Sequence, residues 1–221
     1  MPVTLSGILS SLEELPAILE HNARSPHKFD SVELPWDPSL DLEDLESRWG
    51  YWTFFEVTAA QAEEVASRLR GRTRWALKLR TGGLVAGAFP NCADIFRFVQ
   101  VCHTHRKSYK FTAGLHHARP GSYPLTYAPE AERARMNGFL NLFLACAFHW
   151  QGGLAESSFQ TLLQENDASA LTWSPDRLTW NDRSLSRTEI SNFRAMAARS
   201  FGSCSFTEPM EELQALGWLE A

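Results

Sequence analysis

Two kinds of hydrophobic pattern alternate along the first two thirds of the chain. Segments in which every second side chain has the same character, which is typical of β-strands, are followed by segments with the three- and four-residue spacing of amphipathic helices. The strand-like segments are rich in aromatic and β-branched residues, as in YWTFFEV at 51–57. The predicted strands are 3–9, 29–34, 51–57, 75–80 and 109–115, and the predicted helices are 11–22, 41–49, 59–70, 92–106 and 133–150.

Strand and helix follow one another about four times, with short connections between them. Such alternation predicts an α/β fold, in which repeated β-α units form a parallel sheet covered by helices. We expect a β/α barrel-like domain over 1–152, and a C-terminal α+β appendage packed on the same domain over 153–221. Within this appendage the pattern predicts helices at 156–165, 188–200 and 209–216 and a small hairpin at 171–185.

Charged side chains recur on one face of the predicted strands. At 75–80 (WALKLR), Leu77 and Leu79 share one face, while Lys78 and Arg80 share the other. Strands of a parallel sheet that is covered on both faces are apolar, so charges on one face of consecutive strands favour a different architecture. A partial or TIM-barrel-like barrel fits, because such barrels place their sites at the C-terminal ends of the strands. The charges on this face are Glu33, Glu56, Lys78, Arg80 and Lys110.

This set of charges predicts a ligand pocket with an anion-binding side and a carboxylate side. Lys78, Arg80 and Lys110 would hold a carboxylate or a phosphate, and arginine can do so through two parallel hydrogen bonds. Glu56 or Glu33 would act as a general base or as a metal ligand. A lysine that is packed among cations can also lose its proton and become a Schiff-base nucleophile. The alternative is a solvated sheet face on which the charges only pair with one another.

The loops after these strands carry further candidate residues. Gly82 and Gly83 follow the strand at 75–80, and glycine lets backbone N–H groups approach an anion closely; the alternative is an ordinary tight turn. His116 and His117 follow the last predicted strand and are candidate acid/base groups or metal ligands. Because adjacent residues of an extended chain point in opposite directions, we expect at most one histidine to face the ligand.

Composition and charge exclude several classes of partner. The chain has 21 Lys and Arg against 26 Asp and Glu, a formal net charge of −5, which makes it a poor partner for nucleic acid. Its longest apolar stretch, 139–150, is shorter than the roughly 20 residues that a membrane span requires. The start of the chain lacks the pattern of a signal peptide, so we expect a cytoplasmic protein. The four cysteines lack the spacing of a metal site, so we expect free thiols and no cofactor.

Five short strings of the sequence stand out as a set: KLRTGG at 78–83, AFP at 88–90, KFTAGLHH at 110–117, MNGFLN at 136–141 and FGSCSF at 201–206. Together they resemble an uncharacterised family of bacterial proteins with the motifs KxRTGG, KxTAGLHH, MxGFLN and GSCSF, a resemblance that implies no particular substrate or reaction. The string KFTAG is also similar to class I aldolases of the deoxyribose-phosphate type, in which a strand-end lysine precedes a Thr/Gly loop that contacts phosphate. This similarity implies a Schiff base on Lys110 and a substrate contact from Thr112.

The leading interpretation is an enzyme that acts on a small anionic, oxygen-rich metabolite by lyase- or isomerase-like chemistry. Two alternatives stay open: a metal-dependent enzyme with glutamate and histidine ligands, and a binding or assembly module without activity. Four or five strands cannot close an eight-stranded barrel, so we also expect a homodimer or a partner subunit that completes it. The candidate catalytic residues are Lys110, Glu56 and His116, and the candidate substrate-binding residues are Lys78, Arg80, Gly82, Gly83, Thr112, Glu33 and His117.

Overall fold

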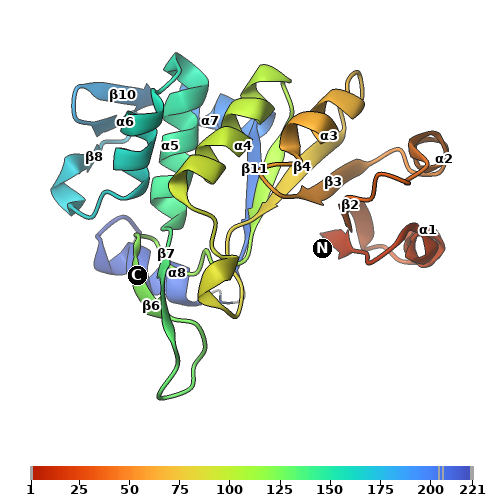
Figure 1. The fold of residues 1–221 in the computed structure, drawn as a ribbon, viewed down its shortest axis with the longest axis horizontal. Coiled ribbons are helices and arrows are strands. Elements are labelled where there is room, and N and C mark those ends of the chain that lie inside the picture. Colours follow the sequence, from red (N-terminus) through yellow and green to blue (C-terminus); the bar gives the residue numbers. More distant parts are fainter. Residues whose placement is uncertain (1, 204, 206, 220–221) are drawn as a thin grey trace.

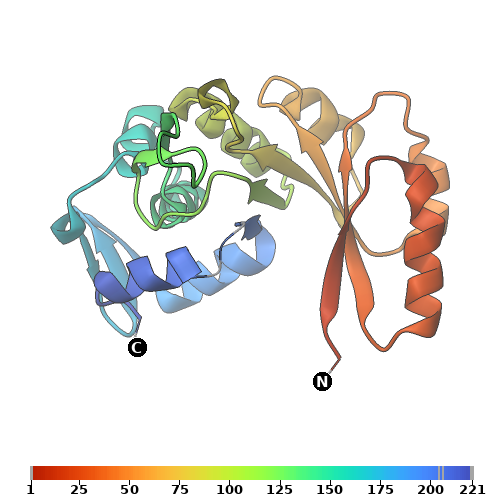
Figure 2. The same ribbon diagram turned by 90° about the horizontal axis from the view of Figure 1, so that it is seen from below.

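A curled, six-stranded parallel sheet forms the centre of the molecule. The computed structural model describes residues 2–203, 205 and 207–219, and its main sheet has the strand order β1-β2-β3-β4-β5-β11. Figures 1 and 2 show this sheet as an open arch, so the predicted α/β fold and partial barrel are confirmed. The strands are β1 (Thr4–Ile8), β2 (Lys28–Pro35), β3 (Trp52–Val57), β4 (Trp75–Arg80), β5 (Tyr109–Thr112) and β11 (Ala198–Gly202).

Helices connect the first five strands and cover the convex face of the sheet. Two of these helices begin at residues that cap them: the Asp41 side chain accepts hydrogen bonds from two backbone N–H groups of its helix, and the Asn91 side chain accepts one. The connecting elements are η1 (Leu12–Glu14), α1 (Leu15–Arg24), α2 (Leu42–Arg48), α3 (Ala62–Arg68), η2 (Ala86–Ala88) and α4 (Cys92–Thr104).

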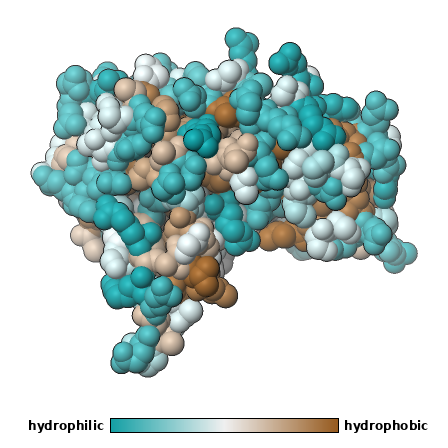
Figure 3. Space-filling model, viewed as in Figure 1, coloured by the Kyte–Doolittle hydropathy of each residue, from teal (hydrophilic) through white to brown (hydrophobic). Residues whose placement is uncertain are grey.

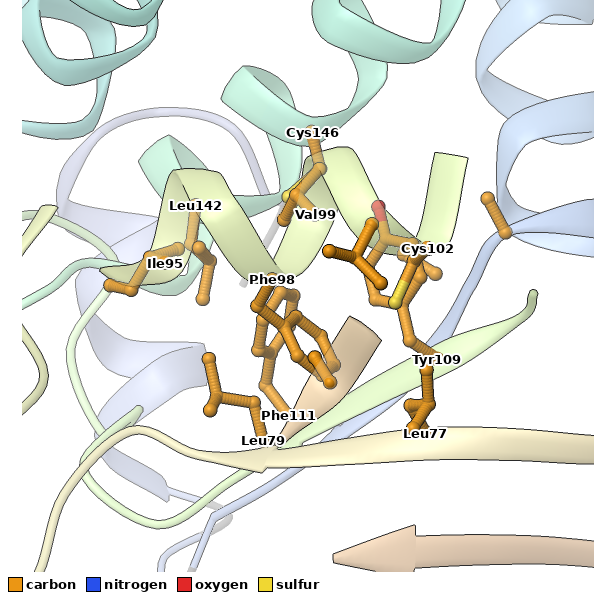
Figure 4. Packing of buried hydrophobic residues seen from close by; sticks show 14 of the residues in the cluster. Leu77, Leu79, Ile95, Phe98, Val99, Cys102, Tyr109, Phe111, Leu142 and Cys146 are labelled. Atoms are coloured by element: carbon orange, nitrogen blue, oxygen red, sulfur yellow. The ribbon is translucent and has the colours of Figure 1, made fainter. Parts of the chain in front are cut away.

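The aliphatic face of the strands packs against these helices, as the alternation predicts. Leu77, Leu79 and Phe111 are almost completely buried in the main hydrophobic core, where they meet Ile95 and Phe98 of α4 (Figure 4). Full burial of a side chain of this size contributes about 1.5–3 kcal/mol relative to an exposed one. With this face committed to the core, the alternate residues of the same strands lie on the concave face of the sheet.

The segment at 133–150, predicted as one helix, is a strand followed by a helix. β7 (Arg133–Met136) pairs antiparallel with β6 (Gly121–Pro124), and α5 (Phe139–Gly152) begins after Gly138. A Cβ atom at Gly138 would come within 2.5 Å of backbone atoms of the preceding loop, so the chain must pass here without a side chain. Exposed and buried residues alternate along β7, which is the period of a strand and not of a helix.

The C-terminal part of the chain returns to the main sheet. The predicted helix at 188–200 is wrong over its last four residues, because α7 (Arg187–Met196) ends early and β11 then pairs in parallel with β5. The predicted hairpin is a small sheet with the order β10-β9-β8. The other elements of this part are α6 (Glu156–Leu163), η3 (Ala168–Ala170), β8 (Leu171–Trp173), β9 (Arg177–Trp180), β10 (Arg183–Ser186) and α8 (Thr207–Ala215).

Polar side chains dominate the surface of the molecule in the view of Figure 3, with apolar side chains in small patches. Two exposed apolar residues, Leu84 and Val85, lie in the loop between β4 and α4. Among the residues that the structure describes, no helix combines the length and the apolar character needed to cross a membrane.

Candidate functional site

The charged side chains that the sequence places on one face of the sheet form one connected network. Lys78 Nζ lies 2.8 Å from Glu33 Oε2 and 2.8 Å from Glu56 Oε2. Lys110 Nζ lies 2.5 Å from Glu33 Oε1, and Arg80 Nε lies 3.2 Å from Glu56 Oε1. We call these five residues the charge network; with three cations and two carboxylates it carries one net positive charge.

The curl of the sheet brings the members of the charge network together. Glu33 is on β2 and Lys110 is on β5, so two strands separate them in the sheet order. Three strand spacings in a flat sheet would place their backbones about 14 Å apart. The contact between their side chains therefore runs across the concave side of the half-barrel, where the Lys110 ammonium also lies 5.2 Å from the centre of the Phe54 ring on β3.

The inner part of the charge network is buried, and its outer end is accessible. Glu33, Lys78 and Lys110 are 5%, 4% and 9% exposed, so the alternative of a solvated sheet face does not describe them. The side chains of Glu56 and Arg80 are 29% and 53% exposed. The network is thus a buried ionic cluster that reaches solvent at the carboxyl ends of β3 and β4.

Both carboxylates of the charge network are stabilised in the ionised form. Burial alone would raise the pKa of Glu33, but the hydrogen bonds and charges of Lys110 and Lys78 outweigh it, and the pKa lies below the usual value. Burial would likewise raise the pKa of Glu56, but the hydrogen bonds and charges of Lys78 and Arg80 outweigh it and lower the pKa. At neutral pH both groups are therefore hydrogen-bond acceptors and potential proton acceptors.

A cavity of about 510 Å³ adjoins the accessible end of the charge network. Glu56 and Arg80 line it, and we call it the carboxyl-edge cavity because loops that follow β2, β3 and β4 form its walls. The terminal nitrogens of Arg80 make no hydrogen bond with the described residues, because the contact with Glu56 uses Nε. The remaining lining residues are Pro35, Trp36, Val57, Thr58, Ala59, Ala60, Gln61, Leu79, Gly87, Ala88, Pro90 and Asp94.

The glycines after β4 join two loops of the sheet edge. The hydroxyl of Thr81 donates a hydrogen bond of 2.7 Å to the carbonyl of Ala113, in the loop after β5. A Cβ atom at Gly82 would lie 2.6 Å from the Cα atom of Gly114, which itself has a φ of +70°. The close approach of the two backbones therefore accounts for Gly82 and Gly114, whereas the predicted contact of Gly82 and Gly83 with an anion stays a prediction.

The two histidines after β5 have different partners. His116 Nδ1 lies 3.2 Å from the Ser203 hydroxyl, and burial lowers the pKa of His116. His117 Nδ1 lies 2.6 Å from Glu212 Oε1 of α8, and its ring stacks on Tyr123 with 3.4 Å between the ring centres. Neither histidine is among the residues that line the carboxyl-edge cavity.

His117 and Glu212 together attach α8 to the loop after β5. The second oxygen of Glu212 accepts a hydrogen bond of 2.6 Å from the backbone N–H of Ala118. The sequence reasoning did not identify Glu212, and no local pattern marks it, because it lies far along the chain from its partners. Thr112, another predicted substrate contact, is half-buried at the end of β5, opposite Gly202 of β11.

Two further side chains extend the concave face beyond the predicted set. The Ser6 hydroxyl donates a hydrogen bond of 3.2 Å to Glu33 Oε1, and the Arg199 guanidinium lies 4.2 Å from the centre of the Trp52 ring. Ser6 belongs to a predicted strand, so the alternation of that strand could have placed it on the concave face. Arg199 lies in a segment that was expected to be helical, so the sequence pattern did not indicate its position on the sheet.

The described residues hold no group of three or more His, Cys, Asp and Glu side chains suited to a metal ion. The two glutamates of the proposed metal-dependent alternative are each in contact with lysine ammonium groups. Cys92, Cys102 and Cys146 are free thiols, as predicted. Cys204 and Phe206, from the string FGSCSF, lie outside the described residues.

Comparison of the chain with protein-family models, with curated proteins and with solved structures gives no significant match.

Proposed function

We propose that this protein is an enzyme that binds a small anionic, oxygen-rich metabolite in the carboxyl-edge cavity and acts on it by isomerase- or lyase-like proton transfer. One observation carries the proposal: a buried charge network ends in an accessible arginine and glutamate that line a cavity of about 510 Å³. Cavities of about 300–1,000 Å³ are typical of small-molecule sites, and the carboxyl edge of a parallel sheet is where they occur in α/β folds.

Arg80 is the proposed anion ligand. Its terminal nitrogens are available, and a guanidinium can hold a carboxylate or a phosphate through two parallel hydrogen bonds. Glu56 is the proposed proton acceptor, positioned by Lys78, which binds its other oxygen at 2.8 Å. An anion that draws Arg80 away removes one of the two cations that lower the pKa of Glu56. Substrate binding would in this way make Glu56 a stronger base at the moment when one is needed.

Proton transfer to Glu56 fits an isomerase- or lyase-like reaction. Glu56 would take a proton from a carbon next to a carbonyl group, and the cationic network would stabilise the negative charge that develops on the oxygen. In an isomerisation, the proton returns to the neighbouring carbon, and the hydroxyl proton on the first carbon moves to the oxyanion on the second. In an elimination, the carbanion instead expels a leaving group from the next carbon. The predicted acid/base role of His116 is not part of this proposal, because His116 is not among the residues that line the carboxyl-edge cavity.

A ligand screen with three probes tests the binding part of this proposal. We expect at least one of pyruvate, malate and dihydroxyacetone phosphate to bind in titrations followed by NMR, and Arg80→Gln to weaken that binding about tenfold or more. Arg24→Gln is the matched control, because Arg24 is exposed on α1, where it pairs with Glu20. Binding that is equal in wild type and Arg80→Gln, or no binding of any probe at millimolar concentration, would contradict the proposal.

Uptake of solvent deuterium tests the proposed chemistry. In D₂O we expect the bound probe to exchange a carbon-bound proton, and Glu56→Gln to slow this exchange about a hundredfold, which is the usual scale of general-base catalysis. Exchange at an unchanged rate in Glu56→Gln would show that Glu56 is not the base.

A Schiff base on Lys110 is a second form of the same proposal. It requires the Lys110 amine to attack a carbonyl carbon, and Lys110 Nζ would first have to leave its contact with Glu33 Oε1 at 2.5 Å. Thr112 follows on the same strand as Lys110, on the same face of the sheet. Reduction with borohydride in the presence of pyruvate or dihydroxyacetone phosphate should then attach the probe to Lys110 and not to Lys110→Met protein. No lysine adduct in wild type would remove this form of the proposal and leave proton transfer by Glu56 to be judged separately.

An assembly module is the second candidate function, and the open edges of the sheet favour it. β1 and β11 are the outer strands of the half-barrel, and Ile8 of β1 is 76% exposed. Exposed edge strands pair readily with a second chain. Sedimentation velocity should show a dimer that Ile8→Lys converts to a monomer. A stable wild-type monomer at micromolar concentration would count against assembly through this edge.

A further inference from the structure

A second cavity, of about 720 Å³, lies on the other side of the loop between β4 and α4. It shares Pro90 with the carboxyl-edge cavity, but no member of the charge network lines it. Arg133 and Arg135 of β7 form part of its wall, and we call it the β7 cavity. The other lining residues are Ala86, Phe89, Pro90, Asn91, Cys92, Ala93, Ala134, Asn137, Gln160 and Gln164.

The β7 cavity is positively charged and has no acidic side chain among the described residues that line it. Arg133 donates a hydrogen bond to the backbone oxygen of Ser122, and Arg135 makes no hydrogen bond or ion pair with the described residues. Two exposed guanidinium groups on one strand, with amide side chains around them, form a binding surface for an anion with several oxygens.

The first turn of α4 adds to this preference. Cys92 and Ala93 line the cavity at the start of a helix of 13 residues, whose dipole favours negative charge; the Asn91 side chain caps one backbone N–H of this turn, and the Asp94 carboxylate lies in the same turn but does not line the cavity. Phe89, Pro90 and the alanines supply an apolar wall. The cavity thus combines a cationic part with an apolar part, and its volume is that of a site for an organic ligand with one charged end.

A third cavity, at the amino edge of the sheet, is also lined by cationic side chains, but some of these are already bound to groups of the protein. Arg72, Arg106 and Lys107 line its volume of about 430 Å³. Lys107 Nζ donates to the carbonyl of Arg72 at 2.9 Å, and Arg72 Nε lies 2.9 Å from Glu46. Lys107 and Arg72 therefore bind groups of the protein itself, and Arg106 of this cavity provides a control residue.

We propose that the β7 cavity binds the phosphate monoester of a small organic molecule, with Arg133 and Arg135 as phosphate ligands. The apolar wall formed by Phe89 and Pro90 would receive the organic part. This site goes beyond the proposed function, because it uses none of the residues assigned to catalysis at the carboxyl-edge cavity.

Adenosine monophosphate, inorganic phosphate and adenosine are the probes that test this site. Adenosine monophosphate should raise the thermal midpoint of unfolding, and adenosine at the same concentration should not. Arg135→Gln should weaken the binding of adenosine monophosphate about tenfold or more, whereas Arg106→Gln and Arg80→Gln should leave it unchanged. Arg135 is exposed on a two-stranded ribbon, so Arg135→Gln should keep the fold, and the thermal midpoint of the unliganded variant checks this.

Alkylation of Cys92 gives a second, local readout. Cys92 is partly exposed in the β7 cavity, whereas Cys102 and Cys146 are buried. Adenosine monophosphate should slow the reaction of iodoacetamide with Cys92, measured by peptide mass spectrometry, and should not do so in Arg135→Gln protein. No response to any phosphate probe, equal responses to adenosine and its monophosphate, or a response abolished by Arg80→Gln instead of Arg135→Gln would each overturn the proposal.

Discussion

Replacement of Glu33 by glutamine tests the charge network at its buried centre. The carboxylate accepts hydrogen bonds from the side chains of Lys78, Lys110 and Ser6. In Glu33→Gln protein, Lys78 keeps Glu56 as a partner, but the buried ammonium of Lys110 loses its only carboxylate among the described residues. Breaking a buried pair in this way costs about 3–5 kcal/mol. Because the glutamine oxygen can still accept a hydrogen bond, we expect a loss near the lower end, about 3 kcal/mol.

Urea denaturation followed by tryptophan fluorescence measures this loss. With a slope of about 2 kcal/mol per molar urea, 3 kcal/mol moves the unfolding midpoint by about 1.5 M. Glu20→Gln is the matched control, because Glu20 pairs with Arg24 on the surface, where such pairs contribute about 1 kcal/mol or less. If Glu33→Gln destabilises no more than Glu20→Gln, the network is not the buried ionic cluster described above.

The same comparison has a defined dependence on pH. Because the pKa of Glu33 is lower in the folded protein than its usual value of 4.5, ionised Glu33 stabilises the fold at pH values above 4.5. This contribution falls as the pH drops below 4.5 toward the lowered pKa. The difference in unfolding free energy between wild type and Glu33→Gln should therefore shrink on acidification, and a difference that grows would refute the assignment.

Three further substitutions test other parts of the structure. Gly82→Ala places a Cβ atom against backbone and should cost about 1–3 kcal/mol in urea denaturation, whereas Gly87→Ala, with open space around its Cβ position, should cost much less. Glu212→Gln removes the charged partner of His117 and should make α8 more sensitive to limited proteolysis without a change in far-UV circular dichroism. Burial lowers the pKa of Lys107 to about 8, so the unfolded state binds more protons than the folded state above that pH. Wild type should accordingly gain stability relative to Lys107→Met between about pH 8 and pH 10, and a loss over this range would contradict the lowered pKa.

The period of two in the strands was sufficient to predict the inner members of the charge network. Leu77 and Leu79 define the core face of β4, and the residues between them then fall on the opposite face whatever the curvature of the sheet. The contact between Glu33 and Lys110 was not predictable in the same way, because it depends on the curl of four strands and not on any one of them.

Three short strands, β6, β7 and β11, escaped prediction, and the last two did so for a common reason. β7 and β11 consist largely of alanine, arginine, methionine and serine, which have no strong preference for strands, and each is four or five residues long. Only pairing with another part of the chain makes such segments strands, and the partner of β11 lies far back in the sequence. Arg133 and Arg135, which line the β7 cavity, were for this reason absent from the predicted site.

The position of β11 also affects how the chain is completed during synthesis. β1 to β5 follow one another along the sequence and can associate as they leave the ribosome, but the strand that covers the free side of β5 is made only after α5, α6, α7 and two small sheets. Until residues 198–202 emerge, β5 presents unpaired backbone groups to other chains. A chain whose synthesis stops before this point would keep β5 as an exposed edge strand. Such an edge can pair with other chains, so we expect the truncated chain to aggregate unless a chaperone binds it.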